Sequence, residues 1–136
     1  MASTRILLVD DNETVRLTLS QVLEDNDFKV VTASSVHEAL HLIDSETFDV
    51  LLSDLHMPGA GDGLTLVSAM RHSNPKAVTL VLSGFPEMAD AAAAILMQAD
   101  EILVKPLAVK SLVNTIRQHL LGEHVKPRRV ESIADI

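Results

Sequence analysis

Cysteine is absent from the 136-residue sequence, and no run of apolar residues approaches the length of about 18 that a membrane-spanning helix needs. Without cysteine there is no disulfide framework and no thiolate metal site, which fits a reducing compartment. The polar start of the chain, residues 1–5, lacks the apolar core of a signal peptide. These absences predict a cytoplasmic protein with no membrane segment.

Positive charge is also scarce. Lysine and arginine number 11 against 19 aspartates and glutamates, which gives a formal net charge of -8 at pH 7. A surface of this sign repels phosphate backbones, so we predict that this domain does not itself bind nucleic acid.

The length and hydrophobic content predict one folded domain. A chain of 136 residues fits the usual domain size, and hydrophobic residues make up 47% of it. This content favours a sheet covered by helices on both faces, because the strands of such a sheet are apolar throughout. We assign residues 1–122 to this domain. Residues 123–136 carry a short basic stretch, and we interpret them as a linker or the start of a further helix, from a longer protein or packed on a partner.

Short runs of β-branched residues and leucine alternate with segments of helical periodicity. This order is what parallel strands with helical crossovers require. The predicted strands are residues 6–9, 28–33, 49–53, 77–82 and 102–104. The first predicted helix is capped by Asp11 or Asn12 and ends near residues 25–27. The second covers 35–44 and is opened by a capping box of Ser35 and Glu38. The others are predicted over 64–71, 87–98 and 109–121. The pattern predicts an α/β fold with five strands.

Charged residues follow three of these strands directly. Asp10 and Asp11 come after the first strand, Asp54 after the third and Lys105 after the fifth. The carboxyl ends of parallel strands lie on one edge of the sheet, so we expect these four side chains to converge there. Three carboxylates facing one ammonium repel one another, and the grouping therefore implies a bound divalent metal or a protonated acid.

The residue types at this edge suit phosphoryl chemistry. Oxygen ligands from Asp11, Asp54 and the backbone carbonyl just after Asp54 fit Mg²⁺. Lys105 is then a point charge for a phosphoryl oxygen, and Ser83, which follows the fourth strand, is a hydroxyl donor. Asp54 is the candidate nucleophile, because a carboxylate can accept a phosphoryl group covalently.

Together these residues resemble a known family, the receiver domain of two-component response regulators. The resemblance spans roughly residues 4–121. Its motifs are Asp10-Asp11 after the first strand, Asp54-Leu55-His56-Met57-Pro58 after the third, Ser83-Gly84 after the fourth and Lys105-Pro106 after the fifth. The resemblance implies a flavodoxin-like, doubly wound sheet of strand order 2-1-3-4-5.

The resemblance also implies a function. Asp54 is expected to take a phosphoryl group from a sensor histidine kinase or phosphotransfer protein, with Mg²⁺ held by Asp11, Asp54 and the carbonyl of His56, and with Asp10 acting through water. Lys105 and Ser83 are expected to contact the phosphoryl group. The domain is then a signalling domain that assists its own phosphorylation and dephosphorylation, and a homodimer through the fourth helix, fifth strand and fifth helix is a further expectation.

Two features depart from the family pattern. Ile102 stands three positions before Lys105, where the family usually has an aromatic residue whose rotamer is coupled to the hydroxyl residue. The loop between Pro58 and Asp62 is also one residue longer than the common pattern. The first departure calls the usual aromatic switch into question.

Other functions fit the sequence less well. His37-Glu38-Ala39-Leu40-His41 matches the zinc-protease pattern H-E-x-x-H, but the inward face of that helix is better assigned to other residues, which leaves the histidines on a solvated flank. A hydrolase with an aspartyl-phosphate intermediate generally has D-x-D at the first strand, where this chain has adjacent aspartates. A receiver-like binding module without the chemistry usually lacks an acid or the lysine, and both are present here.

Overall fold

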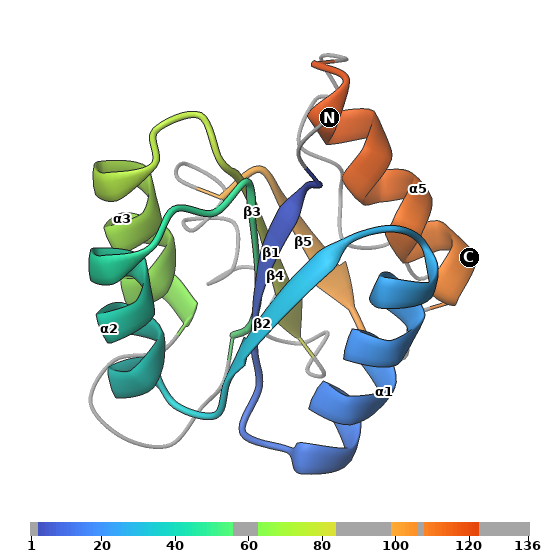
Figure 1. Cartoon of the computed structure of the whole chain (residues 1–136), viewed down its shortest axis with the longest axis horizontal. Coiled ribbons are helices and arrows are strands. Elements are labelled where there is room, and N and C mark those ends of the chain that lie inside the picture. The colour runs from blue at the N-terminus through green and yellow to red at the C-terminus, as the bar shows by residue number, and fades with distance from the viewer. Residues whose placement is uncertain (1–2, 56–62, 84–98, 106–107, 123–136) are drawn as a thin grey trace.

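A computed structural model describes residues 3–55, 63–83, 99–105 and 108–122. Its strands are β1 (Arg5–Val9), β2 (Lys29–Ala33), β3 (Val50–Asp54), β4 (Val78–Ser83) and β5 (Glu101–Val104). Its helices are α1 (Glu13–Asp25), α2 (Val36–Ser45), α3 (Gly63–Ser73) and α5 (Val109–Leu120). All strands are parallel and form one sheet in the order β2-β1-β3-β4-β5 (Figure 1). The predicted fold and strand order are confirmed, and the helix predicted over 87–98 lies outside the described residues.

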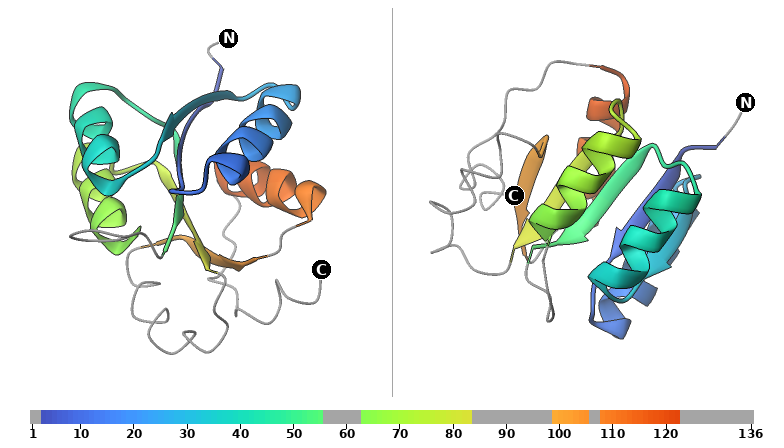
Figure 2. Two further views of the ribbon diagram at one scale, coloured as in Figure 1. Left: turned by 90° about the horizontal axis from the view of Figure 1, so that it is seen from below. Right: turned by 90° about the vertical axis from the view of Figure 1, so that its left-hand side faces the viewer.

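The sheet lies between two layers of helices, as the left view of Figure 2 shows. Successive residues of a strand point to opposite faces. In β1, Leu7 and Val9 therefore pack in a core with α2 and α3, whereas Ile6 and Leu8 pack in a second core with α1 and α5. Because both faces are covered, β3 and β4 are buried along their whole length. This burial explains the continuous apolar runs in the sequence.

Side-chain caps fix where the first two helices begin. The Asn12 side chain accepts a hydrogen bond from the Val15 backbone N–H at 3.0 Å, so Asn12 and not Asp11 is the cap of α1. The Ser35 hydroxyl accepts from the Glu38 N–H at 3.1 Å and caps α2. The Glu38 carboxylate accepts in return from the backbone N–H of Ser34, at 2.6 Å. The capping box therefore differs from the prediction in one bond: the Glu38 carboxylate binds the N–H of Ser34, one residue before the Ser35 cap.

The sequence predicted the start of β2 less closely than the end of α5. The strand predicted from Phe28 begins at Lys29, because the Phe28 N–H still bonds to the Leu23 carbonyl at 3.1 Å in the turn that ends α1. After α5, Gly122 has a φ of 72°, in the left-handed region that glycine adopts without strain. Gly122 was the predicted stop. No helix within the described ranges is long and apolar enough to cross a membrane.

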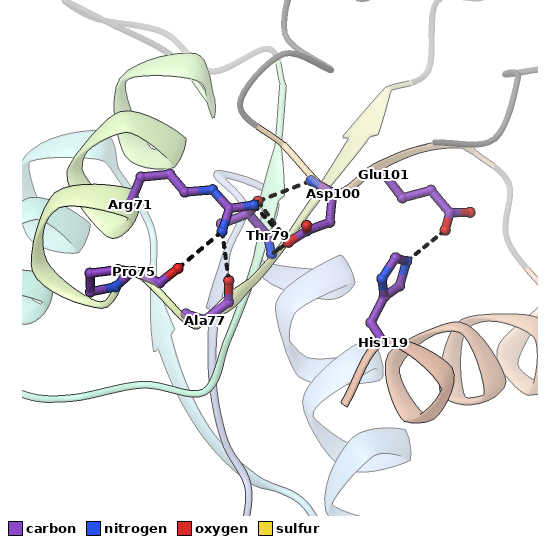
Figure 3. A network of polar contacts seen from close by, with 7 residues as sticks. All are labelled: Arg71, Pro75, Ala77, Thr79, Asp100, Glu101 and His119. Carbon is purple, nitrogen blue, oxygen red and sulfur yellow. Dashed lines mark hydrogen bonds and ion pairs between the residues drawn. The ribbon is translucent and has the colours of Figure 1, made fainter. Parts of the chain in front are cut away.

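Polar side chains hold the amino end of β5 on both faces of the sheet (Figure 3). The Asp100 carboxylate accepts hydrogen bonds from Arg71 Nη2 of α3 and from the Thr79 backbone N–H, each at 2.8 Å. The next residue, Glu101, points the other way, with Oε1 2.9 Å from His119 Nε2 of α5. The short edge strand β5 is thereby tied to α3 and to α5.

Candidate functional site

The three aspartates singled out in the sequence meet at the carboxyl edge of the sheet, the lower edge in Figure 1. Asp10 and Asp11 directly follow β1, and Asp54 is the last residue of β3. The parallel register pairs Val9 with Ser53, which brings the ends of the two strands side by side. One carboxylate oxygen from each aspartate lies within 4.8 Å of the others. Backbone pairing alone is therefore sufficient to gather the acids.

Burial differs sharply among the three carboxylates. Asp10 is 1% exposed and Asp54 is 8% exposed, whereas Asp11 lies open to solvent. Burying a carboxylate costs free energy unless it is paired. Asp10 is paired on both oxygens: Oδ1 accepts from the Asn12 backbone N–H at 2.9 Å, and Oδ2 from Lys105 Nζ at 3.1 Å.

Lys105 supplies the positive charge of the site. Its Nζ lies 3.1 Å from Asp10 Oδ2 and 3.4 Å from Asp54 Oδ2. Burial by itself lowers the pKa of Lys105, but the hydrogen bond that its ammonium donates to Asp10 and the charges of Asp54 and Asp10 outweigh burial and raise the pKa above its ordinary value of 10.5. A raised lysine pKa stabilises the fold fully below the unfolded-state pKa, and that stabilisation is lost only as the pH rises through the folded-state pKa. The ammonium is therefore charged throughout the neutral range.

Ser83 lies at the same edge. It is the last residue of β4, is 4% exposed and pairs in register with Val104. Its carbonyl oxygen accepts a hydrogen bond from the Lys105 backbone N–H at 2.8 Å, so the ends of β4 and β5 are fixed to each other. The predicted backbone ligand, His56, lies outside the described residues.

Other residues, which the sequence did not single out, hold the backbone of the site. The buried Ser53 hydroxyl donates to the Asp54 carbonyl oxygen at 3.0 Å. A Cβ placed on Gly63, the first residue of α3, would lie 2.7 Å from that same oxygen. The Arg16 side chain of α1 donates from Nη1 to the Asp10 carbonyl at 2.7 Å. Only Gly63, at the end of a glycine-rich segment, left a recognisable signal in the sequence.

The donor set fits a hard divalent cation. Carboxylate oxygens are the ligands that Mg²⁺ and Ca²⁺ prefer, and one ammonium does not balance three acids. The exposed Asp11 provides an open side through which an ion can enter. Within the described ranges, these aspartates are the one group of at least three His, Asp or Glu side chains close enough to hold an ion.

The H-E-x-x-H segment has a structural explanation. His37 and His41 are exposed on α2, while Val36, Ala39 and Ile43 form its buried face. Glu38, which a protease would use as its base, accepts hydrogen bonds at the start of the helix. The segment is therefore a solvated helix face.

Ile102 occupies the position where an aromatic residue is usual in the family that the sequence resembles. Its side chain is 1% exposed and packs in the core shared with α2 and α3. Ile102 is an enclosed aliphatic side chain, so there is no aromatic ring at this position whose rotamer could be coupled to the Ser83 hydroxyl.

A five-stranded, doubly wound parallel sheet with an acidic, lysine-bearing carboxyl edge defines the class of protein. The chain belongs to the response regulator receiver domain family, whose model matches residues 6–117. Receiver domains are signalling domains of two-component systems and interact with histidine kinases.

Curated relatives are longer than this chain. The response regulator protein FleR of Pseudomonas aeruginosa is 30% identical over 121 residues, which are 89% of this chain and 25% of FleR. The response regulator MprA of Mycobacterium bovis is 35% identical over 133 residues, which are 97% of this chain and 56% of MprA. The chain thus spans about a quarter of one relative and about half of the other.

Solved structures share the fold over most of this chain. A CheY-like receiver domain protein of Methanospirillum hungatei matches with a TM-score of 0.81 and 25% identity, over 89% of this chain and 96% of that one. A response regulator of Burkholderia pseudomallei with a phosphorylated aspartic acid and a calcium ion matches at 0.76 and 33%, over 88% and 70%. TrrA of Thermotoga maritima, in complex with Mg²⁺ and BeF, matches at 0.76 and 27%, over 85% and 98%.

Proposed function

We propose that Asp54 accepts a phosphoryl group from a histidine kinase or phosphotransfer protein, in a Mg²⁺-dependent reaction that switches an output or a partner interaction. One observation carries this proposal above all. Asp54 ends β3 within 4.8 Å of the carboxylates of Asp10 and Asp11 and 3.4 Å from the Lys105 ammonium. An acidic nucleophile thus lies between a cation site and a fixed positive charge.

Each side chain has a distinct role in the transfer. An Asp54 carboxylate oxygen bonds to phosphorus as the phosphorus–nitrogen bond of a phosphohistidine breaks, and the electron pair of that bond goes to the imidazole nitrogen. The Lys105 ammonium, already 3.4 Å from Asp54, stabilises the charge on a phosphoryl oxygen. The Ser83 hydroxyl donates to a second phosphoryl oxygen.

The residues for the cation follow from the same geometry. Asp11 and Asp54 are the proposed direct ligands, together with the backbone carbonyl of His56, and buried Asp10 acts through water. The bound ion supplies neutralisation of charge on the phosphoryl oxygens. Mg²⁺ is the proposed ion, since it binds a few carboxylates and keeps open positions for waters and phosphate oxygens. The Mg²⁺ complex of TrrA and the calcium ion in the Burkholderia protein support a divalent ion in this family.

The test is phosphorylation by a small phosphodonor such as acetyl phosphate, followed by intact-mass spectrometry. Wild type is expected to gain one phosphoryl group with Mg²⁺ and none with a chelator. Asp54→Asn should gain none. Asp44→Asn, which removes an exposed aspartate at the far end of α2, should behave as wild type. Folded wild-type protein that stays unmodified would contradict the proposal.

Several finer features remain proposals. We assign no turnover of a separate substrate to the domain, which instead assists its own phosphorylation and dephosphorylation.

Residues 123–136 are assigned to a linker or an output region, and a homodimer is assigned to a face that includes β5 and α5. Sedimentation with and without a phosphoryl mimic tests the dimer. The protein is expected to sediment as a dimer with the mimic bound and as a monomer without it.

A further inference from the structure

The turn that carries Asp10 and Asp11 is held by an arginine from the following helix. Arg16 Nη1 of α1 donates to the Asp10 backbone carbonyl oxygen at 2.7 Å. The Arg16 side chain is half-buried, and a hydrogen bond from a charged donor at this distance is a strong one. The other polar contacts of Asp10 use its side chain or its N–H. Arg16 thus holds the Asp10 carbonyl oxygen, which those contacts leave unbound.

The carbonyl that Arg16 holds determines the direction of the next residue. The Asp10 carbonyl belongs to the peptide unit that leads into Asp11, and a peptide unit is planar. Fixing the oxygen of this plane therefore fixes the nitrogen and Cα of Asp11. The Asp11 carboxylate is exposed and accepts no hydrogen bond recorded for the described part of the chain, so its direction depends on its backbone.

We propose that Arg16 is a positioning residue for the divalent-cation site, which orients the Asp10–Asp11 peptide and, through it, the Asp11 carboxylate. The inference rests on the cation site of the proposed function. It concerns a residue that touches neither the ion nor the phosphoryl group.

A positioning role and a purely electrostatic role predict opposite changes. The guanidinium is a positive charge close to the site, so as a charge alone it repels a cation, and its removal would tighten Mg²⁺ binding. As a positioning group it fixes a ligand, and its removal would weaken Mg²⁺ binding. The sign of the change in affinity therefore separates the two roles.

The chain offers a matched control in Arg5. Like Arg16, Arg5 donates from Nη1 to a backbone carbonyl, that of Thr47, at 2.8 Å, and its side chain is 33% exposed. It begins β1, whereas Asp10 follows the end of the same strand. Arg5→Met thus removes the same charge and the same kind of hydrogen bond at the far edge of the sheet.

The experiment measures the Mg²⁺ dissociation constant of wild type, Arg16→Met and Arg5→Met by NMR titration of backbone amides. Arg16→Met is expected to bind Mg²⁺ about tenfold more weakly, as for other groups that orient metal ligands, and Arg5→Met to bind as wild type. In phosphorylation by acetyl phosphate, Arg16→Met should need about tenfold more Mg²⁺ for half-maximal rate, and its rate at saturating Mg²⁺ should match wild type.

An unchanged or tighter Mg²⁺ affinity in folded Arg16→Met would overturn the inference. If Arg16→Met does not fold, Arg16→Gln carries the same expectation and the same contrary result. A wild-type protein that binds no Mg²⁺ overturns it too. If wild type binds Mg²⁺ but is never phosphorylated, the proposed function fails while the affinity comparison still decides the role of Arg16.

Discussion

At the scale of single residues, the site is a balance between buried acids and one lysine. Asp10 and Asp54 are buried, and the Lys105 ammonium contacts both. Lys105 thus provides, next to the carboxylates, the kind of positive charge that a bound cation would also provide. The positive charge of Lys105 offsets part of the repulsion between the carboxylates, and in the proposed function it also stabilises a phosphoryl oxygen.

Replacing Lys105 by methionine should separate these two roles. Without the ammonium, the carboxylates gain attraction for a cation, so Mg²⁺ should bind about fivefold more tightly, the equivalent of about 1 kcal/mol of Coulomb energy. Phosphorylation at saturating Mg²⁺ should slow about 100-fold, because a fixed charge for the phosphoryl oxygen is lost. A titration and a phosphodonor assay check both. Weaker Mg²⁺ binding in the variant would contradict this account of the charges.

The sequence predicted residues at this scale unevenly. Asp10, Asp11, Asp54 and Lys105 could be found because each lies at or just after the end of a recognisable strand and because parallel strands end on one edge. Arg16 and Ser53 could not be found in the same way. Their partners are backbone carbonyl oxygens, which carry no residue identity and therefore leave no pattern in a sequence.

At the scale of elements, α3 is fitted closely to β3, the strand that ends in Asp54. Its first residue, Gly63, donates from its N–H to the Leu55 carbonyl at 3.2 Å, and its Cα faces the Asp54 carbonyl. A Cβ there would lie 2.7 Å from the Asp54 oxygen and 3.0 Å from the Leu55 Cα. Both neighbours are backbone atoms, which cannot move aside as a flexible side chain can.

Gly63→Ala should therefore destabilise the protein, although alanine is the better helix former. Helix propensity alone predicts a gain of up to about 1 kcal/mol, whereas the clash predicts a loss of about 1 to 3 kcal/mol. Urea unfolding gives the sign. Thr65→Ala, at an exposed position of the same helix, has no such clash and should be neutral or stabilising. A stabilised Gly63→Ala would mean that β3 and α3 are less closely fitted.

The polar network at the amino end of β5 should matter more than an isolated ion pair. Asp100→Ala removes an acceptor that Arg71 and Thr79 share, and we expect a loss of about 2 kcal/mol. Glu46→Ala removes a single pair with Arg5 whose two side chains are similarly exposed, at 33% and 37%, and should cost less than about 1 kcal/mol. Equal losses in urea unfolding would show that the network adds nothing.

Element boundaries were predictable where a local signal marked them. The cap at Ser35 and the stop at Gly122 were both visible in the sequence. The first residue of β2 was not, because Phe28 has the apolar character of a strand residue but its N–H completes the turn after α1. Apolar character alone does not distinguish those two environments.

At the scale of the whole molecule, the proposed cation binding is coupled to folding through the acidic edge. The acids come from the ends of two strands, so the proposed cation site exists only when the sheet is formed. A ligand that binds only the folded state stabilises it by mass action. The fold class itself was predictable because apolar runs typical of buried strands alternate with segments of helical periodicity over residues 6–121.

Mg²⁺ should therefore raise the free energy of unfolding of wild type, by about 2.7 kcal/mol at a concentration 100 times its dissociation constant. Asp11→Asn should lose most of this gain. Without Mg²⁺, the same variant should be at least as stable as wild type, because one of three crowded negative charges is gone. Thermal unfolding with Mg²⁺ or with a chelator checks both signs. A Mg²⁺ effect of equal size in both proteins would place the ion elsewhere.

A crystal structure with Mg²⁺ and beryllofluoride tests the central claim most directly. The account predicts the beryllofluoride adduct on Asp54 and an ion about 2.1 Å from carboxylate oxygens of Asp11 and Asp54. It also predicts that the Lys105 ammonium contacts a fluorine atom of the adduct. An adduct on another residue, or an ion bound away from the ends of β1 and β3, would contradict it.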